Sequence, residues 1–177
     1  MATNYHDLLI KLGMLPRHAR TEFTDLEKTK LTDFVLNYPI ESPHSFIVQG
    51  SDGIGKNTAL SMLVKRAIEY NKLNECINFG GEKILVRRMP KFIYSWVGVK
   101  PEDLMSGDML VIPNFEQCPF VNDLPGILAK RSANPLFFAL MSCGLRTNPK
   151  LVESFSQVCT IYTAKDSKAF TKTSKEL

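Results

Sequence analysis

The sequence predicts an α/β domain in which helices sandwich a five-stranded parallel sheet. Strand-like apolar runs alternate with helix-like segments along the chain, a pattern typical of parallel sheets with crossover helices. A glycine-rich loop joins the first strand-like run to a long helix-like run, as it does in phosphate-binding loops. The length of 177 residues suits one domain with one hydrophobic core and no separate lid domain.

Five short runs have the composition of strands and are expected at residues 45–49, 83–88, 108–112, 136–141 and 157–162. The third run, DMLVI, is apolar without alternation, as in a strand that is buried on both faces. Helices are expected between the runs, at residues 57–70, 90–97, 122–131 and 148–155. In such a sheet, a nucleotide binds at the edge where the parallel strands end.

The chain divides into three predicted segments: a short helical lead-in at 1–44, a phosphate-loop core at 45–164 and a basic flexible tail at 165–177. In the lead-in, the apolar spacing predicts helices at 4–12 and 25–38, and residues 14–24 look irregular. The tail is rich in Lys, Ser and Thr, a composition typical of flexible chain ends. Contact of this tail with DNA phosphates is an alternative to a purely passive end.

The glycine-rich loop lies in residues 46–58, which read FIVQGSDGIGKNT. Glycines allow backbone N–H groups to turn toward an anion, and the following helix directs the positive end of its dipole at the same point. A lysine in this position supplies a full charge for the β- and γ-phosphates. The residues predicted to hold ATP are Gly50, Ser51, Asp52, Gly53, Ile54, Gly55, Lys56, Asn57 and Thr58. The alternative, a turn whose lysine faces water, leaves the clustering of three glycines unexplained.

The composition limits which partners, metal sites and cellular locations we expect for this protein. The net charge of +4 and the pI of about 8.9 permit contact with nucleic acid without requiring it. The four cysteines are scattered without a C-x-x-C pair, which argues against a metal site or a disulfide framework and fits a reducing cytoplasm. No signal peptide is recognisable, and no apolar run approaches the ~18–20 residues that cross a bilayer. We therefore expect a cytoplasmic protein with no membrane partner.

Five stretches carry a resemblance that covers roughly residues 8–162: LLIKLGMLPRHARTEFTDLE, GIGKN, KILVRRMPKFI, DMLVIPNFE and ILAKRSANPLFFALMSCGL. Together they resemble the DnaC and DnaI helicase loaders and their relative IstB, the transposition helper ATPase, which are AAA+ proteins of the ASCE type. The resemblance implies a P-loop NTPase fold that binds ATP or ADP with Mg²⁺. It also implies an oligomer that acts with single-stranded DNA and a replicative helicase or another ATPase subunit in DNA replication or transposition.

The chain departs from this family at the acidic residues. Family members end the third strand with two acids, one of which helps to hold Mg²⁺ while the other polarises the attacking water. Pro113 and Asn114 stand at those places here, and Asp108 lies at the opposite end of the strand. Glu116 lies beyond the strand, so it is the candidate catalytic residue only if the loop folds back.

Two further departures imply weak hydrolysis. The Thr-Ser-Asn that ends the family's fourth strand is replaced by SCG at 142–144, and no arginine occurs at 152–160, where the family has its arginine finger. The change at Asn57, where Ser or Thr is expected, is milder. The oxygen of Asn57 can accept a magnesium-bound water, with Thr58 beside it, so Asn57 is the predicted contact to Mg²⁺.

By the same resemblance, Arg87, Arg88 and Lys91 are predicted to contact single-stranded DNA, with aromatic residues at 92, 94 and 96 as stacking surfaces. The alternative is that these aromatic residues pack on the sheet.

Two other functions remain open. The loop also resembles that of thymidylate kinases, but such a kinase needs an arginine-rich lid, and residues 130–134 offer only Lys130 and Arg131. The other alternative is a nucleotide-free adaptor that acts through protein contacts alone.

Overall fold

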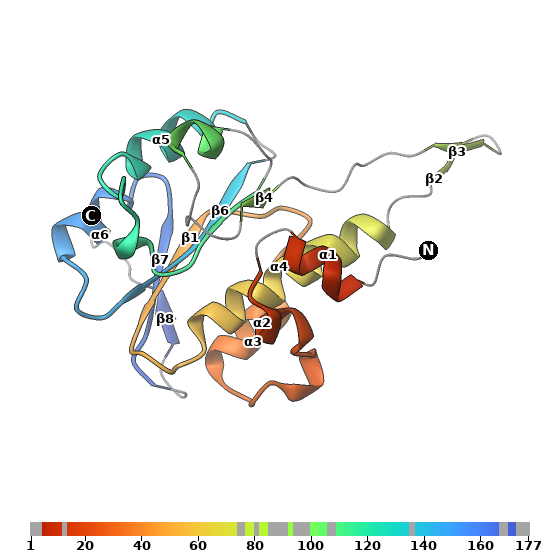
Figure 1. The fold of residues 1–177 in the computed structure, drawn as a ribbon, viewed down its shortest axis with the longest axis horizontal. Helices are drawn as coiled ribbons and strands as arrows, with labels where there is room; N and C mark the ends of the chain where they lie inside the picture. The colour runs from red at the N-terminus through yellow and green to blue at the C-terminus, as the bar shows by residue number, and fades with distance from the viewer. Residues whose placement is uncertain are drawn as a thin grey trace.

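A six-stranded sheet forms the centre of the fold, with helices on both of its faces (Figure 1). The computed structural model describes residues 5–11, 14–73, 77–79, 82–84, 92–93, 100–105, 109–134, 137–166 and 170–172. In spatial order the strands are β4 (Phe92–Ile93), β5 (Met109–Ile112), β6 (Phe138–Gly144), β1 (Phe46–Gly50), β7 (Thr160–Ala164) and β8 (Phe170–Lys172). The first five run parallel and β8 is antiparallel to β7. The α/β class with a mostly parallel sheet is confirmed.

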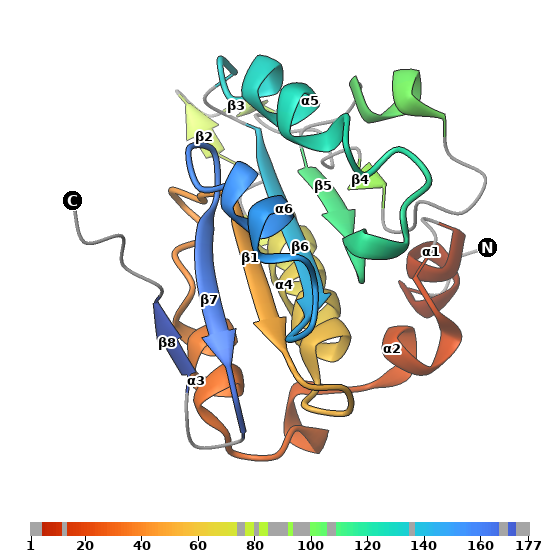
Figure 2. The ribbon, with the colours of Figure 1, turned by 90° about the vertical axis from the view of Figure 1, so that its left-hand side faces the viewer.

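The helices form one layer on each face of the sheet (Figure 2). The first layer holds α1 (Tyr5–Lys11), α2 (Pro16–Arg20), α3 (Lys30–Asn37) and α4 (Lys56–Leu73). The second holds α5 (Leu124–Arg131) and α6 (Pro149–Ser154), together with the 3-10 turns η2 (Pro101–Met105) and η3 (Phe115–Gln117). Each layer packs on the sheet through its own cluster of buried apolar side chains.

Alternate residues of the central strands supply these two clusters. In β1, Phe46 and Val48 pack with the first layer, and Ile47 packs with the second. The same alternation in β5 places Met109 on one face and Leu110 on the other. Successive side chains of a strand point to opposite faces, so strands covered on both sides need apolar residues at every position. This explains why the sequence of β5 is apolar without alternation.

The lead-in differs from its prediction in two places. The helix expected at 25–38 begins later, as α3, because Thr29 caps it: its Oγ1 accepts from the Thr32 N–H at 3.1 Å, and the Thr32 hydroxyl accepts from the Thr29 N–H at 2.8 Å. A 3-10 turn, η1 (Phe23–Asp25), precedes it. The segment expected to be irregular, 14–24, contains the helix α2, whose first residue is a proline with a preset helical φ.

The region after α4 also differs from its prediction. Part of the strand expected at 83–88 pairs elsewhere, because β3 (Glu82–Ile84) forms a separate antiparallel pair with β2 (Ile77–Phe79). The strand beside β5 is instead β4, which lies within the range 90–97 where a helix was expected. Because β4 has only two residues, it is too short to show a strand period in the sequence.

The expectation of five strands missed β8, which lies inside the predicted flexible tail. Phe170 anchors this strand: its ring stacks on Tyr162 with centroids 5.2 Å apart and lies 4.9 Å from the ring of Phe34. An aromatic residue with two ring partners holds its chain segment against the sheet. Part of the expected tail is therefore a paired strand.

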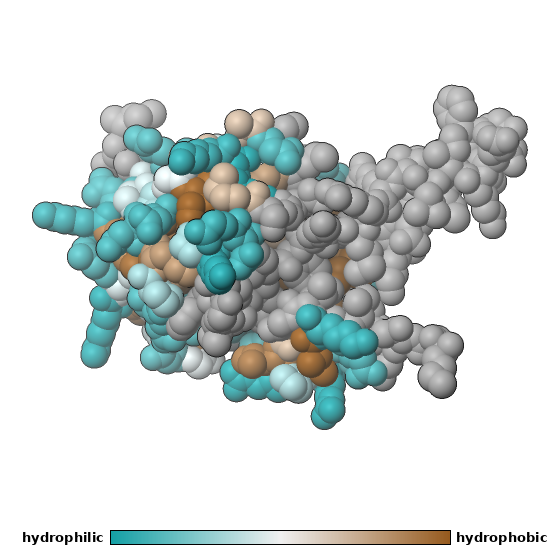
Figure 3. Space-filling view, turned by 45° about the horizontal axis from the view of Figure 1, so that its top comes forward, coloured by the Kyte–Doolittle hydropathy of each residue, from teal (hydrophilic) through white to brown (hydrophobic). Residues whose placement is uncertain are grey.

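The face of the molecule that Figure 3 shows carries small apolar patches. Figure 3, which views the molecule from the side of α5, shows brown atoms in separate groups between hydrophilic ones. The large apolar side chains that are exposed come from separate segments and are Leu15, Leu36, Met105 and Leu145. In the ranges that the structure describes, no helix combines the length and the apolar character needed to cross a bilayer.

Candidate phosphate-binding site

The glycine-rich loop connects the end of β1 directly to the start of α4, as the sequence predicts. Two of its residues, Gly53 and Gly55, have φ angles of 79° and 88°. This left-handed region strongly favours glycine, which explains both positions. The Ala59 N–H donates to the Gly55 carbonyl at 2.8 Å, which begins the helical hydrogen bonding. The first N–H groups of α4 therefore have no intrahelical acceptor, as at other helix starts that bind anions.

Gly50 is required for a different reason, which is close packing at the end of β1. A Cβ atom at this position would lie 2.8 Å from the carbonyl oxygen of Ala164 in the neighbouring strand β7. We therefore expect Gly50→Ala to lower the free energy of unfolding by about 2 kcal/mol, measured by urea denaturation.

Gly126 offers a matched control for this substitution. It lies inside α5, and a Cβ atom there would meet nothing within 4 Å. Gly126→Ala is expected to stabilise the protein by up to ~1 kcal/mol, because alanine loses less conformational entropy in a helix. Equal stability of Gly50→Ala and the wild type would contradict the packing at Gly50.

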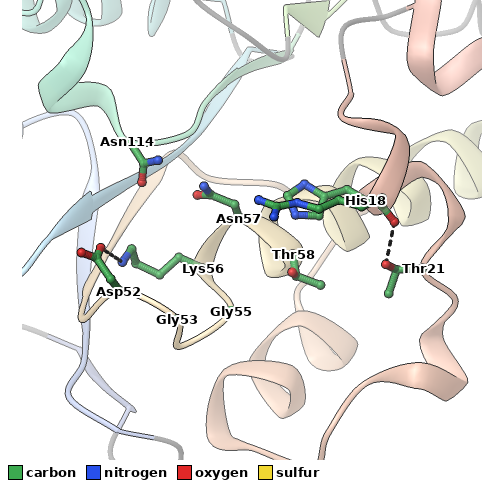
Figure 4. Close-up of a pocket in the computed structure, with 10 residues that line it drawn as sticks. His18, Thr21, Asp52, Gly53, Gly55, Lys56, Asn57, Thr58 and Asn114 are labelled. Carbon is green, nitrogen blue, oxygen red and sulfur yellow. Dashed lines mark hydrogen bonds and ion pairs between the residues drawn. The ribbon is translucent and has the colours of Figure 1, made fainter.

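Lys56 is the first residue of α4 and is buried, with 6% of its surface exposed. Its Nζ donates hydrogen bonds to the carbonyl oxygens of Gly50 and Ser51, each at 2.7 Å. The carboxylate of Asp52 lies 3.9 Å from the same nitrogen but is fully exposed, so water screens this ion pair. Lys56 is thus held over the loop, and Figure 4 shows it turned toward Asp52.

A cavity of about 360 Å³ opens beside the loop. This volume falls in the range of small-molecule sites. Its lining includes the loop and helix residues Asp52, Gly53, Gly55, Lys56, Asn57 and Thr58, and also Asn114 from the end of β5. Three other predicted loop residues are not part of this lining: Gly50 ends β1, and Ser51 and Ile54 lie in the loop.

The opposite side of the cavity comes from the lead-in, which the sequence reasoning did not assign to the site. Arg17, His18 and Thr21, in or just after α2, line it, and Figure 4 shows His18 on the far side of Asn57. Buried Lys65 of α4 holds this segment by donating to the Thr21 carbonyl. The basic run at Arg17, His18 and Arg20 was the available signal, but nothing local in it points to the loop.

The charges that line the cavity favour an anion. Burial lowers the pKa of His18, and the neighbouring charges of Arg17 and Lys65 lower it further, so the ring is neutral near pH 7. Lys56 and Arg17 therefore supply the positive charge. Asp52 is the one carboxylate in the lining, and it points into solvent.

Two partly buried hydrogen bonds at the edge of the cavity connect the residue after β5, strand β6 and the start of α4. The Asn114 N–H donates to the Ser142 hydroxyl at 2.9 Å, and that hydroxyl donates to Oδ1 of Asn57 at 2.8 Å. Ser142 lies in β6, between β5 and β1, and is fully buried. Ser142, the first residue of the SCG that stands in place of the family's Thr-Ser-Asn, thus has its hydroxyl in contact with the loop helix.

Glu116 returns to the sheet edge because η3 turns the chain back after β5. Its Oε1 accepts from the Gly144 N–H at 2.8 Å, at the end of β6. Its Oε2 is buried and has no hydrogen-bond partner among the residues that the structure describes. Glu116 does not line the cavity, so its catalytic role stays a prediction.

The residues present do not fit a magnesium site of the usual kind. Mg²⁺ is commonly held by one or two carboxylates together with substrate phosphates. In the described ranges, no group of three or more His, Cys, Asp or Glu side chains could hold a metal ion. The oxygen of Asn57, the predicted contact to Mg²⁺, already accepts the Ser142 hydroxyl.

The predicted DNA contacts Arg87, Arg88 and Lys91 lie outside the described residues, so they stay predictions.

Comparison with known proteins gives one weak likeness in structure. No family model matches the chain, and no curated protein matches it. A solved structure, described as the crystal structure of the DnaC helicase loader, aligns with 84% of this chain and 99% of that chain, with a TM-score of 0.44 and 12% sequence identity. At this level the likeness carries no argument about function, which has to come from the site itself.

Proposed function

We propose that the chain is a P-loop NTPase-type module that binds ATP through the loop between β1 and α4. The observation that carries the proposal is buried Lys56, held over two loop carbonyls at the head of an 18-residue helix and beside a cavity of about 360 Å³. A buried lysine needs partners for its charge. Phosphate oxygens would replace the two carbonyls as acceptors in a stronger, charge-assisted contact.

The remaining groups of the cavity support the same ligand. The N–H groups at the start of α4 and the loop between Gly53 and Gly55 would surround the phosphates, with Thr58 beside them. Arg17 would meet the ligand from the opposite side. The nucleotide would thus bridge the loop and the lead-in helix α2, which gives it a structural effect beyond its own site.

The same geometry supports slow turnover. Hydrolysis needs a residue that positions or activates the attacking water. The one lining carboxylate, that of Asp52, is fully exposed, and one oxygen of Glu116 is bound to the Gly144 N–H. We therefore propose that ATP orders an interface, as in a module of the helicase-loader type that assembles with DNA and a partner protein in replication or transposition.

Arg131 argues against the nucleotide-kinase alternative. It is 7% exposed, donates to the Leu104 carbonyl at 2.6 Å and lies over the Phe137 ring at 3.9 Å, so packing occupies it. It ends α5, which leads to the start of β6, whereas the phosphate loop follows the end of β1. Because β1 and β6 are parallel, Arg131 and the phosphate loop lie at opposite ends of these strands.

Calorimetric titration of the whole chain with ATP and ADP tests the proposal. We expect a dissociation constant on the order of micromolar and little phosphate release. Phosphoryl transfer to dTMP would select the kinase instead, and the absence of binding to any adenine nucleotide would select the nucleotide-free adaptor. Capture of a replicative helicase in the presence and absence of ATP tests the partner. Binding of single-stranded DNA by a variant with Arg87, Arg88 and Lys91 replaced tests the DNA contact.

A further inference from the structure

We propose that the site recognises the phosphates directly, without a protein-held Mg²⁺, so that ATP binds with similar affinity in the presence and absence of the metal. This inference rests on the proposed ATP binding and specifies how the site contacts the phosphates. It follows from the direction of one hydrogen-bond chain and from the distribution of charge around the cavity.

The donors and acceptors determine the direction of the two hydrogen bonds that join Asn114, Ser142 and Asn57. The backbone N–H of Asn114 can only donate, so the Ser142 hydroxyl oxygen accepts it at 2.9 Å. Ser142 is fully buried, so its own O–H also needs an acceptor, and Oδ1 of Asn57 lies 2.8 Å away. The amide oxygen of Asn57 is therefore directed at β6. Its Nδ2 is a donor only and cannot ligate a metal ion.

With its amide in this orientation, Asn57 differs from the serine or threonine that usually follows the loop lysine. A serine or threonine after the loop lysine offers its hydroxyl oxygen to Mg²⁺. In Asn57 the amide oxygen instead accepts the Ser142 hydroxyl, and the other polar atom of the amide is a donor that a metal ion cannot use. Rotating the amide to present its oxygen would leave the buried Ser142 hydroxyl without this acceptor, at a cost typical of an unsatisfied buried polar group.

The charges around Asn57 also disfavour a metal ion held by the protein. Lys56 and Arg17 line the same cavity and would repel a divalent cation. The end of β5 contributes Asn114, which is neutral and carries its backbone in the left-handed region at φ 51°. Glu116 lies outside the lining with one oxygen already bonded. Any Mg²⁺ that arrives with ATP would thus keep its phosphate and water ligands, with no carboxylate from the described lining other than the exposed Asp52.

Calorimetric titration of the wild-type chain with ATP, in excess Mg²⁺ and in EDTA at matched ionic strength, tests the inference. We expect the two dissociation constants to agree within about threefold. Asn57→Thr places a hydroxyl where the amide stood, and we expect Mg²⁺ to tighten its ATP binding by about tenfold. Ser61→Ala is the matched control, because it removes a hydroxyl that donates to the backbone carbonyl of Asn57 at 2.7 Å, whereas Ser142 donates to the side-chain oxygen.

The outcomes separate the two proposals. Wild-type binding that is tenfold or more tighter with Mg²⁺ would overturn this inference and leave ATP binding intact. No binding in either buffer would instead contradict the proposed function. If thermal melting shows that Asn57→Thr does not fold, Ser142→Ala replaces it, since loss of that hydroxyl frees the amide oxygen and should introduce a dependence on Mg²⁺. An unchanged, metal-independent affinity in both variants would also count against the role assigned to the Asn57 amide.

Discussion

Lys56→Ala is expected to weaken ATP binding by about 100-fold, which corresponds to roughly 3 kcal/mol for a lost charge-assisted contact. Lys56 is the buried cation of the cavity lining, and its Nζ already lies within hydrogen-bond distance of the two loop carbonyls at 2.7 Å. Alanine leaves the loop N–H groups in place but removes the charge that would face the phosphates. Calorimetric titration with ATP measures the change.

Two further variants show whether the effect is local. Lys165→Ala removes an exposed charge just after β7, close enough for the Ser51 hydroxyl to donate to the Lys165 carbonyl at 3.4 Å, but outside the cavity lining. Its dissociation constant is expected to stay within about twofold of the wild type. Arg17→Ala, across the cavity, should cost about tenfold. Unchanged ATP binding in a folded Lys56→Ala protein would remove the basis of the proposed function.

The sequence predicts well those parts of the molecule whose structure is determined by residues that are neighbours along the chain. The loop follows from one window, because the left-handed glycines at 53 and 55, the buried Lys56 and the helix behind them are neighbours. The central strands follow from their apolar runs, since burial on both faces requires apolar residues at each position. These local signals were enough for the α/β class and for the loop.

The parts that the sequence did not show depend on contacts between distant residues. The contact between Ser142 and Asn57 joins positions 85 residues apart, and no local pattern pairs them. Arg17 and His18 reach the cavity because α2 packs against α4, with Lys65 holding the Thr21 carbonyl. Short strands such as β4 and β8 are fixed by pairing with a neighbour, and two or three residues carry too little periodicity to reveal them.

The packing of the lead-in on the sheet also depends on contacts between residues that are distant in the sequence. The buried residues Leu9, Leu31 and Val35 of the predicted lead-in at 1–44 belong to the same apolar cluster as Phe46 and Leu140 of the sheet. One face of the sheet is thus covered in part by the lead-in. The N-terminal helices contribute to the core of the domain and, through α2, to the lining of the candidate site.

Phe46→Ala is therefore expected to lower the free energy of unfolding by about 4 kcal/mol, the cost of removing a large side chain from a packed core. Phe46 is fully buried at the start of β1, and its ring lies 5.4 Å from that of Tyr38 and 5.9 Å from that of Tyr162. Urea denaturation measures the loss. Leu36→Ala, at a residue of α3 that is 50% exposed, is the control and should change stability by less than about 0.5 kcal/mol.

A double-mutant cycle between Phe46 and Phe34 decides whether the lead-in and the sheet share one core. The Phe34 ring comes from α3 and meets the Phe46 ring edge to face, with centroids 5.2 Å apart and planes at 86°. We expect a coupling energy of about 1 kcal/mol, typical of such aromatic pairs. A second cycle between Phe34 and Phe155, which packs on the opposite face of the sheet, should be additive within about 0.5 kcal/mol. Additivity in the first cycle as well would mean that the contact between the Phe34 and Phe46 rings does not couple α3 to the sheet.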